Sequence, residues 1–117
     1  MKAEYLQRGE SLDYTNATEN TIPAGAVVTI ATRLGVAGCD IPPGKTGSLH
    51  ICGVFKVKKT GTAAVAMGTT VYFDGTGLTD AADNGKTSTE KVEYTPAGYA
   101  AAPAAAGDDT ILVQING

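Results

Sequence analysis

The stretch Gly47 to Lys58, Gly-Ser-Leu-His-Ile-Cys-Gly-Val-Phe-Lys-Val-Lys, is the longest part of the chain in which apolar and polar side chains alternate. The two sides of the pattern are Leu49, Ile51, Phe55 and Val57 against Ser48, His50, Lys56 and Lys58. A period of two with one apolar side is typical of a half-buried β-strand. We therefore interpret this stretch as the central strand. Gly53 falls on its apolar side, which predicts a β-bulge or a group packed close to the backbone.

Short strands separated by turns are predicted on both sides of this stretch. Fifteen glycines and five prolines are spread through the chain, and no long segment has helical apolar spacing. We expect strands at residues 26–30, 34–37, 69–73, 77–79, the start of 87–94, and 99–101 with 110–115, the last two as a hairpin with Ile111, Val113 and Ile115 facing inward. The predicted fold class is all-β, a compact small barrel or sandwich of short strands with an extended N-terminal arm.

A weak repeat is visible in the turns. Gly25, Gly44 and Gly68 each close a turn rich in proline or alanine, and a strand follows each of them. The unequal spacing of the three glycines gives little support to an internal duplication.

The first 21 residues differ from the rest of the chain. They are polar, with isolated large apolar groups at Tyr5, Leu6, Leu12 and Tyr14, and only residues 11–15 have the character of a short strand. Such a segment has too little apolar surface to fold by itself. We therefore divide the chain into an N-terminal arm, residues 1–21, and a β-domain, residues 22–117.

Composition limits the size of the core. Hydrophobic residues make up 43% of the 117 residues, but many are alanine, aromatic residues make up 6%, and tryptophan is absent. Large apolar side chains supply most of the free energy of burial. We expect one domain with a modest core, which gains part of its stability against copies of itself or a larger partner.

Charge and hydropathy exclude several classes of partner. The net charge of -3 and the lack of a basic stripe argue against nucleic-acid binding, which needs a cationic face. Neither a signal peptide nor a membrane-spanning stretch is present, so we expect a soluble protein that is made and kept in a cytosol. Cys39 and Cys52 are too few for a disulfide scaffold, and we expect free thiols.

No motif for catalysis or cofactor binding is complete. Gly44-Lys45-Thr46 lacks both the preceding glycine and the following helix of a phosphate-binding loop. His50 and Cys52 share one face of the predicted strand, but a structural zinc site needs four ligands. With a single histidine, no nucleophile, base and orienting group can be assembled. We expect no enzyme activity, no cofactor and no metal.

Taken together, several segments resemble a family of short tailed-phage and prophage proteins, long left as a domain of unknown function, whose studied relatives are capsid decoration or cement proteins. The segments that carry the resemblance are residues 5–12, 22–28, 34–37, 53–55, 68–74 and 109–117. Their order and spacing, over nearly the whole chain, make the likeness. Residues 94–99 depart from the usual Ile-Gly-Val-like strand, which leaves the register of the penultimate strand open. The recombinase-like label sometimes given to such proteins has no support here, because the phosphate-binding loop is missing.

The resemblance implies a virion structural protein that binds the outer surface of the assembled head and stabilises contacts between major capsid proteins. It implies a homo-oligomer, with a trimer favoured over a dimer, made in the host bacterial cytoplasm. We expect the arm to contact the capsid through Tyr5, Leu6, Arg8, Leu12 and Tyr14. Two alternatives stay open: a tail or head-completion component, and a small enzyme or ligand-binding β-domain with a pocket near His50.

Overall fold

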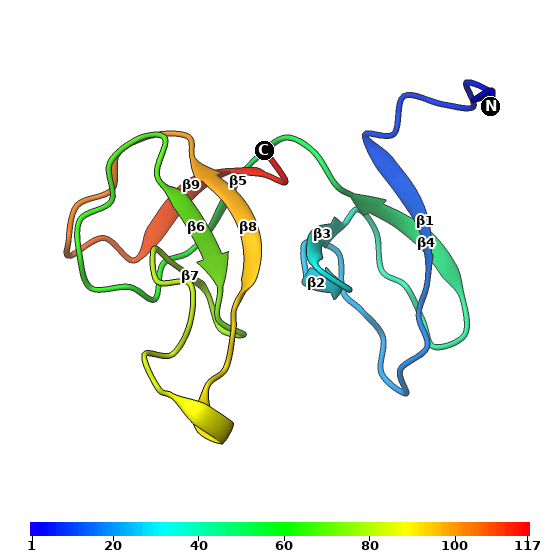
Figure 1. Cartoon of the computed structure of the whole chain (residues 1–117). Coiled ribbons are helices and arrows are strands. Elements are labelled where there is room, and N and C mark those ends of the chain that lie inside the picture. Colours follow the sequence, from blue (N-terminus) through cyan, green and yellow to red (C-terminus); the bar gives the residue numbers. More distant parts are fainter.

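The computed structural model describes all 117 residues, and its strands form two antiparallel sheets that appear as two lobes in Figure 1. The first sheet contains β1 (Ser11–Thr15), β2 (Val27–Ile30), β3 (Arg33–Ala37) and β4 (Thr46–His50), in the order β1-β4-β3-β2. The second contains β5 (Val54–Lys58), β6 (Thr70–Phe73), β7 (Leu78–Thr79), β8 (Thr95–Ala100) and β9 (Thr110–Ile115), in the order β5-β9-β8-β6-β7. The all-β prediction is confirmed, and the arrangement is sandwich-like because neither sheet closes on itself.

The stretch that we interpreted as one central strand is two strands in different sheets. β4 pairs with β1 and β3, whereas β5 pairs with β9. Between them Gly53 has a φ of 120°, a conformation that residues with side chains rarely adopt, and the chain passes there from one sheet to the other. Gly53 therefore marks a connection and not a bulge. The alternation continues across the break, with Leu49 buried and Phe55 and Val57 half-buried.

The C-terminal hairpin is confirmed, and its neighbour is corrected. β8 pairs with β9, and the inward residues Ile111, Val113 and Ile115 are at most 3% exposed. The start of residues 87–94 is not a strand, because Ser88–Glu90 form a 3₁₀ helix and β8 begins only at Thr95. The side chain of Asn84 holds this loop by hydrogen bonds with three backbone groups, at Lys86, Glu90 and Val92, and so competes with strand pairing.

The two sheets repeat one topology, a duplication to which the unequal spacing of the glycines in the sequence gave little support. If β1, β2, β3 and β4 are matched with β5, β6, β8 and β9, the order β1-β4-β3-β2 becomes β5-β9-β8-β6. We call residues 11–50 the first unit and residues 54–115 the second unit. The two-residue turn between β2 and β3 is replaced in the second unit by residues 74–94, an insertion that carries β7 and the 3₁₀ helix.

Hydrogen bonds match between the two units. In the first unit Gly25 N donates to Ala37 O (2.7 Å), and in the second unit Gly68 N donates to Ala100 O (2.8 Å). Ile22 and Ile41 exchange two backbone hydrogen bonds (3.0 and 2.8 Å), and Val65 and Ala104 do the same in the second unit (2.9 and 2.8 Å). The only two buried polar residues, Asn16 and Lys59, occupy equivalent places directly after β1 and β5. Because backbone, turns and buried polar sites all correspond, the chain is an internal structural duplication.

Each sheet has an inner face, which carries its own core, and an outer face. Ala37 and Leu49 mark the inner face of the first sheet, where they form a small buried cluster with Ile41. The inner face of the second sheet carries the larger cluster, and Leu34 and Val36 from the outer face of the first sheet join it. The first unit therefore packs its outer face against the inner face of the second unit.

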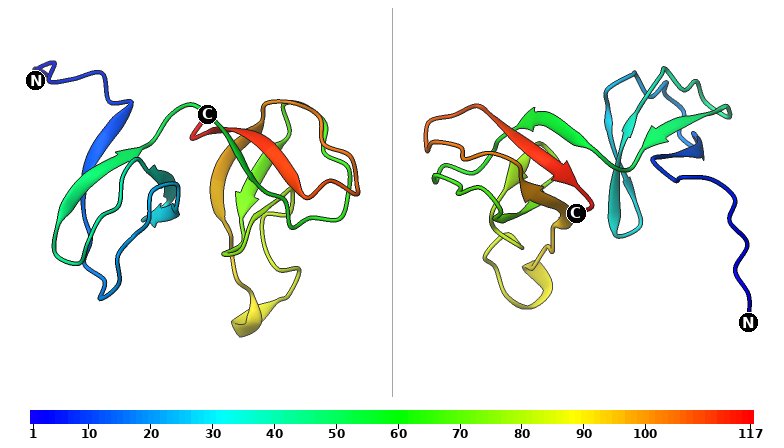
Figure 2. Two further views of the ribbon diagram at one scale, coloured as in Figure 1. Left: turned by 180° about the vertical axis from the view of Figure 1, so that it is seen from behind. Right: turned by 90° about the horizontal axis from the view of Figure 1, so that it is seen from above.

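The chain ends lie at different places in this arrangement. The N-terminal residues extend away from the first lobe, and the C-terminus lies between the lobes (Figures 1 and 2). Next to the C-terminus, Asn116 donates its side-chain Nδ2 to Leu34 O (2.9 Å) and Ile51 O (2.8 Å). The last strand is thereby tied to both the first unit and the connection between units.

Candidate functional site: the N-terminal arm and the groove between the units

Residues 1–9 form no strand or helix, and all of them except Gly9 are exposed. Tyr5 and Leu6 are 79% and 89% exposed, so two large apolar side chains have no cover within the chain. Arg8 lies 4.0 Å from the carboxylate of Glu10, but both side chains are solvated, and such a pair contributes little. Three of the five predicted contact residues are therefore free for an external partner.

The other two predicted contact residues lie in β1, at the base of this segment. Leu12 is 39% exposed and borders a shallow groove with Ile30 and Ile51. Tyr14 is half-buried against the small cluster on the inner face of the first sheet. The five residues follow one another along the chain but do not converge on one compact site. Because β1 pairs with β4, residues 11–15 are part of the sheet.

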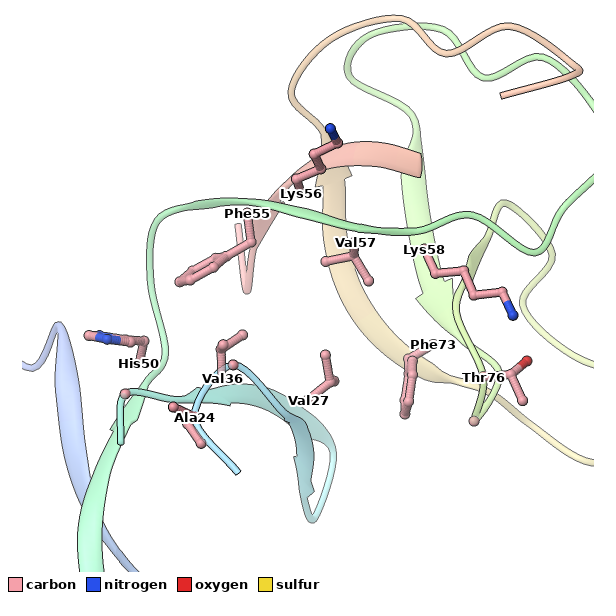
Figure 3. Close-up of a pocket in the computed structure, with 14 residues that line it drawn as sticks. Ala24, Val27, Val36, His50, Phe55, Lys56, Val57, Lys58, Phe73 and Thr76 are labelled. Carbon is pink, nitrogen blue, oxygen red and sulfur yellow. The ribbon is translucent and has the colours of Figure 1, made fainter. Parts of the chain in front are cut away.

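A groove of about 670 Å³ separates the two units, and Figure 3 shows it. Phe55, Val57 and Phe73 of the second unit face Val27 and Val36 of the first across it. The titratable side chains that line it are His50, Lys56 and Lys58. The predicted pocket near His50 therefore exists; 7 of its 14 lining residues are hydrophobic, and its titratable side chains are one histidine and two lysines. No carboxylate or thiol lines it to act as a partner for the histidine.

A network around Asp74 positions the β6–β7 hairpin beside the groove. The carboxylate accepts hydrogen bonds from the Thr60 hydroxyl (2.6 Å), from the Thr76 backbone and hydroxyl (2.9 and 3.0 Å), and from Gly77 N (2.9 Å). Partial burial raises the pKa of Asp74, but these hydrogen bonds lower it more, and the net pKa is below the ordinary value of 3.8. The network thus holds the turn between β6 and β7, where Asp74 N also donates to Gly77 O (3.0 Å).

The remaining candidates for chemistry stand apart from one another. Cys39 and Cys52 are free and exposed, as expected. No group of three or more histidine, cysteine, aspartate or glutamate side chains comes close enough to hold a metal ion. The only helix spans three residues, so no helical segment has the length and apolarity that a membrane crossing requires.

The exposed features of this small β-protein are a free arm and partly uncovered sheet faces, which are surfaces suited to adhesion. Comparison with known families identifies the chain more closely: the family of phage cement proteins matches residues 6–115. The chain therefore belongs to the phage cement protein family, and the resemblance seen in the sequence is confirmed. Membership makes it a structural phage protein that associates with the capsid of the virion. Searches of curated proteins and of solved structures found no match.

Proposed function

We propose that this protein decorates the outer surface of the assembled phage head and stabilises contacts between neighbouring major capsid proteins. Family membership supports a place on the capsid, and the free arm supports the mode of binding. The observation that carries the proposal is the exposure of Tyr5 and Leu6 in a segment without regular structure. Burial of each on a capsid subunit would contribute about 2 kcal/mol, before the cost of ordering the arm.

A weak contact of this kind is sufficient on a repeated lattice. Within the arm, residues 1–9 form no regular structure, and β1 anchors them to the first sheet, where Leu12 and Tyr14 lie. A segment that orders on its partner spends part of its interaction energy on ordering, so affinity per copy is modest. When copies are joined to one another, each further arm binds at a high effective concentration. We therefore propose that the protein acts as a homo-oligomer, with a trimer favoured over a dimer, after synthesis in the cytoplasm of the bacterial host.

The test is decoration of undecorated heads by the purified chain. A variant that lacks residues 1–9 keeps β1 and should fold, and we expect it to leave the heads bare in cryo-electron microscopy. The double variant Tyr5→Ser and Leu6→Ser should bind more than tenfold more weakly, since it loses most of the arm's apolar surface. Met67→Ser is the matched control, because Met67 is 68% exposed in a turn of the second unit.

The outcomes separate the remaining possibilities. Ordered density over the shell with wild type but not with the truncated chain supports the proposal. Equal decoration by both would remove the arm from the contact. A bare shell, with few copies located at the tail or the portal, would instead favour a tail or head-completion component. Loss of decoration in His50→Ala alone would direct attention to the groove between the units, because His50 lies in its wall.

A further inference from the structure

The duplication allows the two inner faces to be compared position by position. The core on the inner face of the second sheet is completed from two sides, by an added edge strand and by the first unit. β7 pairs with β6 and places Leu78, which is 1% exposed, beside the core, and the outer face of the first unit adds Leu34 and Val36. Under this cover Val65 and Val71 are 4% and 0% exposed.

The inner face of the first sheet has neither cover. The two-residue turn between β2 and β3 leaves no strand in the place of β7, and no third unit lies beyond the first. Ile22 and Val28, the equivalents of Val65 and Val71, are only half-buried, and Leu12 is 39% exposed. A groove of about 390 Å³ lies beside Leu12 and Ile30 of this face, and one of about 500 Å³ follows the edge strand β2 beside Ile22 and Val28. The inner face of the first sheet is therefore a surface that no other unit of the chain covers.

The outer face of the second sheet is likewise uncovered. Strand pairing places Val54, Tyr99 and Gln114 in one row, with Leu112 next to it on the same side. Val54, Tyr99 and Leu112 are 56%, 39% and 41% exposed. Tyr99 is the equivalent of Val36, which is 8% exposed because it packs against the second unit. Within the chain, the outer face of the first sheet thus packs against the inner face of the second sheet. The inner face of the first sheet and the outer face of the second sheet have no such partner.

We propose that copies of this chain join head to tail through these two faces, with the outer face of the second sheet of one copy covering the inner face of the first sheet of the next. Such a contact joins two different surfaces, so it forms a closed ring when the rotation between copies closes and a filament when it does not. A ring is the form that the proposed homo-oligomer requires, and the inference rests on that part of the proposed function. Leu12 and Tyr14 are then covered by the neighbouring copy, and the capsid contact falls to Tyr5, Leu6 and Arg8.

Two matched substitutions test the contact from its two sides. Leu12→Glu places a charge on the inner face and Leu112→Glu places one on the outer face, at leucines of almost equal exposure. Val92→Glu is the control, because Val92 is 55% exposed in the insertion and belongs to neither face. Circular dichroism and thermal unfolding verify that each variant folds. Ile30→Glu replaces Leu12→Glu on the inner face if that variant does not.

Light scattering after size-exclusion chromatography then gives the masses. We expect wild type and Val92→Glu to be oligomers of one mass, and each leucine variant to fall to the monomer mass. An equal mixture of the two leucine variants should exceed the mass of either alone, towards a dimer, because each supplies the half that the other lacks.

Three results would overturn the inference. Leucine variants that keep the wild-type mass show that copies meet elsewhere. A mixture that stays monomeric shows that the contact is not head to tail. A monomeric wild type removes the oligomer itself. Decoration of heads by the arm is measured separately, so none of these results is confused with failure to bind the capsid.

Discussion

Replacement of Asn116 tests whether the two units are held together as the structure indicates. Its Nδ2 donates two hydrogen bonds of good length, to Leu34 O and Ile51 O, while the 3.4 Å contact from Leu34 N to Oδ1 is too long to add much. Its φ of 55° lies in the left-handed region. Asn116→Gly keeps that conformation and loses both bonds, at about 1 kcal/mol each, so we expect a loss of about 2 kcal/mol. Asn116→Ala adds the left-handed strain of a side-chain-bearing residue and should lose about 3 kcal/mol.

Urea unfolding of the three proteins, followed by circular dichroism, measures these differences as shifts of the midpoint at constant slope. The order of stability expected is wild type, then glycine, then alanine. A glycine variant within about 0.5 kcal/mol of wild type would show that the two bonds do not hold the units together. An alanine variant as stable as the glycine variant would refute the positive φ.

Three further substitutions test other parts of the structure. Gly98→Ala should cost roughly 3 kcal/mol or more in urea unfolding, because Gly98 has a φ of 138° and an added Cβ would overlap the Gln114 carbonyl oxygen. Lys59→Leu should lose roughly 2 kcal/mol in the same assay, since the buried Nζ donates a 2.6 Å hydrogen bond to Gly61 O. Asp74 has a lowered pKa, so its contribution is complete above pH 3.8 and is lost as the pH falls through the lower folded value. Asp74→Asn should therefore be less stable than wild type at neutral pH, with the difference shrinking in acid.

The sequence predicts strands well where the pattern is local, and fails where the outcome depends on a distant partner. Val27–Ile30 and Thr110–Ile115 are recognised because each is a short run rich in β-branched residues that follows a turn. The break at Gly53 escapes notice because the three-residue connection keeps the phase of the alternation on both sides. Alternation indicates which way side chains point and gives no information on which strand pairs with which. The pairing of β4 with β1 and of β5 with β9 depends on segments far away in the sequence, so only the structure shows it.

The duplication is hidden for a different physical reason. What the two units share is backbone geometry, such as positive φ at Gly25 and Gly68, and two mutual bridges between residues that need only be apolar. Ile41 in one unit and Ala104 in the other serve the same bridge, so the side chains diverge while the hydrogen bonds stay. Gly25 and Gly68 are equivalent, whereas Gly44 belongs to a different turn of the first unit, so the three glycines do not mark one repeat. The insertion at residues 74–94 also lengthens the second unit, so the segments that follow it lose the offset kept by the segments before it.

In the candidate site, too, one part could be predicted from the local sequence and another part could not. The freedom of Tyr5 and Leu6 follows from local composition, because a polar segment with two isolated apolar groups has no core to bury them in. The uncovered inner face of the first sheet does not follow from composition. Leu12 has the chemistry of a core residue, yet it is 39% exposed on a face that neither an added strand nor another unit covers. Phe55, the equivalent of Leu12 in the second unit, is half-buried against the larger core cluster, and this comparison shows what Leu12 lacks.

These observations connect the weakness of the core to the proposed assembly. Only 18 of the 117 residues are buried, and the first unit has a buried cluster of three, so an isolated copy gains little from its own interior. Whatever covers the inner face of the first sheet binds the folded chain and not the unfolded one, and mass action then makes assembly a source of stability. On the proposed function, the lattice of the head would supply the high local concentration that this coupling needs. A small, incompletely covered domain is thus well suited to the decoration of an assembled shell that we propose.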